Sequence, residues 1–367
     1  MRKNEEVTMQ AAKRILSLTL ALVLVLALAA CGAQSSTATT AAPETTAAPE
    51  TTEAVAETAA ETETEAVASH YPVTIENVNF ELEKTEFTYE KAPEKVITFW
   101  TNSLETMLAL GLGDRVMLAV GQDEDSILPE LKDEYNRVKD NFQLYNDFLD
   151  SNAALSKESA VMMEPDFILA WKSSFNDKTL GDTTYWNEKG VGTYIALNSN
   201  NVSEYRTLEN EYTDILNIGK IFDVEDKANE IVDNLKNEVE RVTSATKDQP
   251  KKTVLVFEFL GDNIWNYDKT MLAGDMVTAM GGELMEAPDE FGKEDIINLN
   301  PEVIFVIGNS QEAVEKVTSD PALASLQAVQ NGNVYNLPLS YVYTSGVRTI
   351  YGLNAIGAGL YPELYAD

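Results

Sequence analysis

Two stretches of this 367-residue chain repeat one layout, and this duplication restricts the fold more than any other feature. In the first stretch, Lys157-Glu158 is followed by a hydrophobic segment, by Pro165-Asp166 and by a short apolar run. In the second, Lys293-Glu294 is followed by the same features, with Pro301-Glu302 in the equivalent place. The proline comes seven residues after the glutamate in both stretches. The repetition predicts two related lobes.

A second pair of segments supports this prediction. The segments 104–111 and 273–281 both have the pattern of a helix that a glycine ends, and each precedes its copy of the first repeat. Strands rich in β-branched residues alternate with helical segments, and the clearest are Val96–Phe99, Phe167–Ala170, Thr253–Phe259 and Val303–Ile307. This alternation is typical of α/β proteins with parallel sheets. The expected fold is therefore two similar Rossmann-like α/β lobes.

One long amphipathic helix is expected between the halves. Apolar residues recur every three to four positions from Val224 to Thr246, which is the helical period. Asp223 is the expected N-cap, and the polar segment that leads to Pro250 is expected to end the helix. A single packed helix between two lobes predicts a stiff spine rather than a flexible hinge, so the lobes are expected to close only modestly.

The N-terminus has the features of an export signal. Lys13 and Arg14 precede an apolar run at 15–30, which suits a signal-peptide core and is short for a membrane span. Small residues then lead into Cys31, and this resembles the lipobox of bacterial lipoproteins, which implies that Cys31 is lipidated. The alternatives are an ordinary signal peptide with an incidental cysteine, or an uncleaved anchor.

The segment that follows cannot form a core. Residues 33–69 are almost only Ala, Thr, Glu, Pro and Ser, so they predict an extended tether or an O-glycosylated stalk. The complete organisation expected is a signal peptide (1–30), a lipid-anchored low-complexity linker (31–70), a lead-in (71–92), an N-terminal lobe (93–222), the spine helix (223–247) and a C-terminal lobe (248–367).

Composition excludes several functions. The net charge of −33 disfavours nucleic acid and anionic lipid as partners. The only cysteine, Cys31, and the only histidine, His70, are both expected to lie before the folded part. That part would then have no disulfide, no usual zinc site and no Ser-His-Asp or Cys-His nucleophile. Gly111-Leu112-Gly113 lacks the third glycine of a dinucleotide-binding loop, because Val116 occupies that position. The chain is therefore not expected to be an enzyme.

Four stretches, at 96–116, 163–170, 299–304 and 328–335, together resemble the substrate-binding proteins of iron-siderophore, haem and cobalamin ABC importers. The resemblance covers about residues 93 to 362 and implies two lobes joined by one long helix. It implies a monomer without a cofactor, lipid-anchored outside the cytoplasm, that captures a chelated metal, above all a ferric siderophore, and delivers it to the importer permease. Haem or cobalamin binding on the same fold, or a surface carbohydrate-binding lipoprotein, are the alternatives. Axial histidine ligation of haem is excluded, and Met or Tyr ligation is not.

The resemblance also implies that Glu158 and Glu294 dock on arginines of the permease. The alternative is that each glutamate only stabilises a helix N-terminus.

Ligands of open α/β sheets lie beyond the carboxyl ends of the strands. Aromatic and polar residues that suit a large flat ligand follow the predicted strands, namely Trp100, Thr101, Asn102, Trp171, Lys172, Trp265, Asn309, Tyr341, Tyr343 and Arg348. Each aromatic ring could instead pack in a core. Arg348 and Lys172 are expected to offset the charge of an anionic chelate, although Arg348 could instead bond its own C-terminal segment. Tyr341 or Tyr343 could ligate iron, whereas no site for a bare metal ion is expected.

Overall fold

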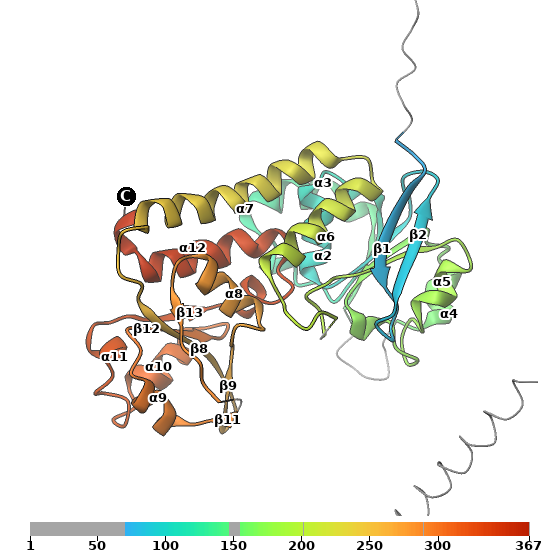
Figure 1. Ribbon diagram of the computed structural model, residues 1–367. Coiled ribbons are helices and arrows are strands. Elements are labelled where there is room, and N and C mark those ends of the chain that lie inside the picture. The colour runs from blue at the N-terminus through green and yellow to red at the C-terminus, as the bar shows by residue number, and fades with distance from the viewer. Residues whose placement is uncertain (1–69, 147–154, 201, 289, 367) are drawn as a thin grey trace, which may run out of the picture. The chain divides into compact units, whose positions relative to one another are not determined.

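The computed structural model describes residues 70–146, 155–200, 202–288 and 290–366, shown in Figure 1. Cys31, the predicted signal peptide and the linker before His70 lie outside these residues. The described part contains two largely parallel sheets with helices between their strands, which confirms the expected α/β class. No helix in these four ranges is both long enough and apolar enough to cross a membrane.

The N-terminal lobe contains a five-stranded parallel sheet. Its strand order is β5 (Gln143–Tyr145), β4 (Val116–Val120), β3 (Val96–Phe99), β6 (Phe167–Ala170) and β7 (Gly192–Ile195). Its helices are α2 (Thr101–Ala109), α3 (Lys132–Val138), α4 (Lys157–Met162), α5 (Thr183–Asn187) and α6 (Leu208–Ile221). Every residue of β3, β6 and β7 is buried, as expected for parallel strands that are covered on both faces.

The C-terminal lobe contains the second sheet. Its strand order is β11 (Glu290–Phe291), β9 (Asn263–Asn266), β8 (Thr253–Leu260), β12 (Val303–Ile307) and β13 (Val334–Leu337), and β10 (Glu283–Leu284) also pairs with β8. Strands β8, β12 and β13 are parallel, whereas β9 is antiparallel to both of its neighbours. The helices of this lobe are α8 (Leu272–Ala279), α9 (Lys293–Leu299), α10 (Glu312–Thr318), α11 (Gln327–Gln330) and α12 (Thr349–Leu360).

The repeated Pro-acid pair has the same structural role in both lobes. The Asp166 carboxylate accepts hydrogen bonds from the backbone N–H groups of Glu94 (2.8 Å) and Lys95 (2.7 Å), just before β3. The Glu302 carboxylate accepts a hydrogen bond from the Thr253 N–H (2.9 Å), at the first residue of β8. In each lobe an acidic residue just before one central strand, β6 or β12, therefore holds the start of the neighbouring strand, β3 or β8.

The glycine-ended helices of the second repeat are α2 and α8. Each is followed by a glycine in the left-handed region, Gly111 with φ 74° and Gly281 with φ 87°. A residue without Cβ adopts this conformation at no steric cost, so both helices end where the sequence predicts.

The predicted spine is α7 (Glu225–Thr246), which packs against α6 and α12 (Figure 1). Its buried side chains include Ala228, Val232, Leu235 and Val242, all on the predicted apolar face. The predicted cap is wrong. Val224 occupies the N-cap position without a side-chain cap, and Asp223 precedes it in the left-handed region (φ 57°).

The lead-in is an antiparallel hairpin of β1 (Val73–Val78) and β2 (Lys84–Tyr89). His70, just before it, packs on the N-terminal lobe, with its Nε2 2.7 Å from the carbonyl oxygen of Lys220. The next residue, Tyr71, donates its hydroxyl proton to the carbonyl of Ile221 (2.8 Å). The expectation that the histidine precedes the folded part is therefore wrong, and the folded part does contain a histidine that could ligate a metal.

Candidate functional site

A cavity of about 470 Å³ lies where strand ends of both sheets meet. Its lining comes from the segments after β3, β4 and β6 of the N-terminal lobe and after β12 and β13 of the C-terminal lobe, namely Trp100, Thr101, Asn102, Gly121, Asp123, Ser126, Trp171, Asn309, Leu339, Ser340, Tyr343 and Arg348. The chain order of the first sheet reverses at β3, whose neighbours are β4 and β6. Such switch points are the usual ligand sites of open α/β sheets, and the volume suits a small molecule.

Three aromatic rings form one wall of this cavity. The ring centroids of Trp100 and Trp171 are 4.9 Å apart with an interplanar angle of 30°. The Tyr343 ring, from the C-terminal lobe, is 5.5 Å from Trp171. The guanidinium of Arg206 lies 4.7 Å from the centre of the Tyr343 ring, within cation–π range. The wall therefore draws on both lobes and offers a ligand three aromatic rings, which are tilted against one another by 30° and 57°.

Arg348 forms a buried ion pair across the two lobes. Its Nε and Nη2 lie 2.5 Å and 2.8 Å from the two carboxylate oxygens of Glu105 on α2. Arg348 is 6% exposed and Glu105 is fully buried. Nη2 also donates to the carbonyl of Ser126 (2.5 Å), and Glu105 accepts a further hydrogen bond from the Leu128 N–H (2.9 Å). The charge of Arg348 is thus paired with Glu105 of the N-terminal lobe, while its Nη1 also donates to Ser340 Oγ (3.2 Å) in its own C-terminal segment.

A second buried carboxylate holds the same C-terminal segment. Glu211 on α6 accepts hydrogen bonds from the N–H groups of Ser345 (3.1 Å) and Gly346 (2.6 Å) and from Asn198 Nδ2 (2.7 Å). Burial raises the pKa of Glu211, while these three hydrogen bonds act in the opposite direction. Asn102 Nδ2 also donates to the carbonyl of Thr344. Residues 344–348 are therefore fastened to the N-terminal lobe by side chains of α2 and α6.

Comparison with known proteins gives the family. Residues 154–341 match the model of a family described as periplasmic binding protein. The chain belongs to this periplasmic binding protein family. The expected resemblance is therefore confirmed, and the protein is a substrate-binding protein.

Individual relatives agree with this assignment. An uncharacterised ABC transporter substrate-binding lipoprotein of Bacillus subtilis is 24% identical over 307 residues, which are 81% of this chain and 88% of the relative. The crystal structure of a periplasmic binding protein from Veillonella parvula has 30% identity and a TM-score of 0.73, and the match covers 80% of this chain and 93% of the other. A protein of an Fe³⁺-hydroxamate transport system from Saccharomonospora viridis has 22% identity and a TM-score of 0.60, with 80% and 100% covered, and shares the fold.

Seven of the ten ligand residues predicted from sequence line the cavity of this periplasmic binding protein, namely Trp100, Thr101, Asn102, Trp171, Asn309, Tyr343 and Arg348. The other three do not. Lys172 places its Nζ 4.9 Å from the centre of the Phe80 ring, and the Tyr341 ring packs on Tyr351 at 5.3 Å. Trp265 is 48% exposed on β9. No local sequence pattern indicates that Ser126 or Leu339 lines the cavity. The apolar run of β4 ends at Val120, so the expectation that ligands lie beyond strand ends could have indicated Gly121 and Asp123.

Trp265 lines a larger hollow, of about 1020 Å³. Residues 259–265, 291–293 and Lys316 form it, and all belong to the C-terminal lobe. The smaller cavity is the better candidate, because it combines aromatic rings and polar groups from both lobes of the family fold.

The predicted docking residues occupy equivalent positions. Glu158 and Glu294 are each the second residue of a short helix, α4 and α9, and both are exposed. The preceding lysines have other contacts, since Lys157 lies 4.7 Å from the Tyr185 ring and Lys293 pairs with Asp320 at 2.5 Å.

Proposed function

We propose that this protein is the lipid-anchored, extracytoplasmic substrate-binding subunit of an ABC importer, and that its substrate is a ferric hydroxamate or a similar metal chelate without a large negative charge. The description of the Bacillus subtilis relative supports the importer and the lipid anchor. The Saccharomonospora viridis protein, whose system transports Fe³⁺-hydroxamate, supports the substrate class.

The charge of the cavity wall is the observation that carries this proposal. Among the described lining residues only Asp123 and Arg348 are charged, and Glu105 neutralises Arg348. Hydroxamate ligands balance the charge of a ferric ion, whereas catecholate ligands leave an anion. An anion that loses its water in this cavity would find no uncompensated positive charge on the wall. The three aromatic rings favour the less charged chelate.

The same wall favours a metal that arrives already chelated. It contributes a single carboxylate, from Asp123, and neither histidine nor cysteine from the described residues. A bare transition-metal ion needs several such ligands. Of the two tyrosines considered as iron ligands, only Tyr343 is among the described lining residues, and this supports a contact between Tyr343 and the chelate.

Tryptophan fluorescence tests the substrate class, because Trp100 and Trp171 line the cavity. A ferric trihydroxamate should quench the emission and raise the melting temperature, since it binds only the native state. Ferric tricatecholate, haem, cobalamin and oligosaccharides should not. Trp171→Ala should weaken binding about tenfold or more, as loss of a buried aromatic contact does. Trp265→Ala is the matched control and should leave the affinity unchanged.

Two outcomes would contradict the proposal. Tight binding of the tricatecholate without the hydroxamate would show that the charge argument is wrong. Binding of an oligosaccharide alone would show that the protein does not carry metal chelates.

We also propose that Glu158 and Glu294 dock on arginines of the permease. Their equivalent, exposed positions support this role. Glu158→Ala combined with Glu294→Ala should abolish uptake of the ferric chelate by cells and leave its affinity for the purified protein unchanged. The control is Glu188→Ala with Glu312→Ala, which removes one exposed glutamate from each lobe and should leave uptake intact. Equal uptake by both double variants would refute this role.

A further inference from the structure

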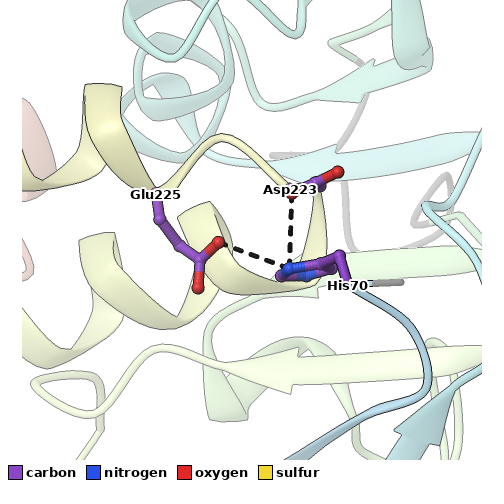
Figure 2. A group of neighbouring side chains, drawn as sticks. All are labelled: His70, Asp223 and Glu225. Atoms are coloured by element: carbon purple, nitrogen blue, oxygen red, sulfur yellow. Dashed lines mark ion pairs between the residues drawn. The ribbon is translucent and has the colours of Figure 1, made fainter. Parts of the chain in front are cut away.

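The only histidine of the chain faces two carboxylates at the start of α7. His70 Nδ1 lies 3.3 Å from Asp223 Oδ1 and 3.4 Å from Glu225 Oε2. Figure 2 shows both carboxylates approaching this one ring nitrogen. The three donor atoms all lie within 4.8 Å of one another, and no other set of three such residues is found in the described part of the chain.

The hydrogen bond on the far side of the ring fixes which nitrogen faces the carboxylates. Nε2 lies 2.7 Å from the carbonyl oxygen of Lys220, and a carbonyl can only accept, so Nε2 carries a hydrogen. In the neutral ring Nδ1 then presents a lone pair. Ionised carboxylates also only accept, so the lone pairs of three acceptors converge. This arrangement requires a positive charge among them, which is either a proton on Nδ1 or a metal ion.

The distances favour the metal ion. A charge-assisted N–H···O bond measures about 2.7–2.9 Å, which is shorter than both separations here. Around a tetrahedral Zn²⁺ with ligands at about 2.0–2.1 Å, neighbouring ligand atoms are about 3.3–3.4 Å apart. The separations of 3.3 Å and 3.4 Å between Nδ1 and the two carboxylate oxygens agree with this spacing, and all three ligand atoms lie within 4.8 Å of one another. A backbone carbonyl that holds the other ring nitrogen is also the usual support of a metal-ligating histidine.

We propose that His70, Asp223 and Glu225 bind a divalent transition-metal ion, of which Zn²⁺ fits the donors and spacing best. The site is open to solvent, because the His70 side chain is 18% exposed and the carboxylates are 57% and 42% exposed. A water molecule would complete the coordination. The ion would join His70, three residues before β1, to the start of α7, and so stabilise the packing of this segment on the N-terminal lobe. This structural site is independent of the substrate cavity.

The test uses the full chain, produced without a histidine tag and stripped of metal. Zn²⁺ binding is measured by calorimetry and by the melting temperature, which Zn²⁺ should raise and EDTA should restore. Nitrogen-15 NMR of the imidazole gives an unambiguous readout, since the chain has one histidine. Zn²⁺ should shift the Nδ1 resonance and leave the proton on Nε2.

Three variants test the assignment. His70→Gln and Glu225→Gln should each weaken Zn²⁺ binding at least about tenfold. Asp226→Asn removes an exposed carboxylate from the same helical turn, outside the cluster, and should bind as the unmodified chain does. Unchanged melting temperatures of all variants in EDTA would show that they fold.

Two results would overturn the proposal. One is an imidazole that carries protons on both nitrogens and does not respond to excess Zn²⁺. The other is Zn²⁺ binding that His70→Gln leaves unchanged.

Discussion

The two lobes share a plan but contribute different charged groups to the contact around residues 344–348. The N-terminal lobe supplies buried acceptors, the carboxylates of Glu105 and Glu211. The C-terminal lobe supplies donors, the guanidinium of Arg348 and the N–H groups of Ser345 and Gly346. The scaffold is thus duplicated, whereas the segments after the strands have diverged. This difference indicates that function in this fold lies in those segments.

The largest effect on stability should come from removing the guanidinium of Arg348 from the contact between the lobes. Arg348→Met leaves the Glu105 carboxylate buried without its cation, which should lower the free energy of unfolding by about 3–5 kcal/mol. Urea denaturation measures this change. Glu105→Met combined with Arg348→Met removes the whole pair and should restore most of the loss. A single variant as stable as the unmodified protein would show that the pair is not important for stability.

An intermediate effect on stability is expected at the two glycines that end α2 and α8, and it should be larger in the C-terminal lobe. Gly111→Ala places a Cβ in open space, so it should cost only the left-handed backbone, about 1–2 kcal/mol. In Gly281→Ala the new Cβ would lie 3.1 Å from the Tyr361 hydroxyl, which should add about 1 kcal/mol or more. Equal melting temperatures of the two variants would show that both lobes tolerate alanine equally well after the helix end.

The smallest effect should be a pH dependence of stability that comes from Asp214, a residue of α6 that accepts hydrogen bonds from Tyr194 and Leu197. Burial, followed by the nearby Glu211 carboxylate, holds the pKa of Asp214 well above its usual value. The folded state therefore binds this proton more tightly than the unfolded state. The contribution of Asp214 to stability is complete below the unfolded pKa of about 3.9 and declines as pH rises towards the folded pKa.

Asp214→Asn tests this sign. Urea denaturation from about pH 4 to pH 8 should show a flatter decline in the free energy of unfolding for the variant than for the unmodified chain. An identical decline in both would contradict the assignment to Asp214.

The strands at the centre of each sheet were predictable because they are buried on both faces. β3, β6 and β12 have the bounds that the apolar runs predict, and β8 is longer than predicted by only Leu260. The helical period of α7 is equally clear, because one face of this long helix packs on the rest of the protein. The hairpin of β1 and β2 has no comparable apolar run, because one face of it is exposed and charged.

The site was only partly predictable. Because ligands lie beyond the carboxyl ends of the strands, the sequence alone locates Trp100, Trp171 and Tyr343. The local turn decides whether a neighbour such as Lys172 faces the cavity. The Glu105–Arg348 pair joins residues 243 positions apart, so neither segment alone reveals it.

The segment that carries Arg348 continues directly into α12, which begins at Thr349 and packs along α7. If a substrate shifts Arg348, the shift cannot be absorbed in a loop, because no loop separates Arg348 from the helix. We expect the shift to reach the first turn of α12 directly, and the far end of this helix is held where the Tyr361 hydroxyl bonds the carbonyl of Gly281 (3.1 Å). An environment-sensitive dye attached near the end of α12 would thereby signal cavity occupancy without touching the cavity.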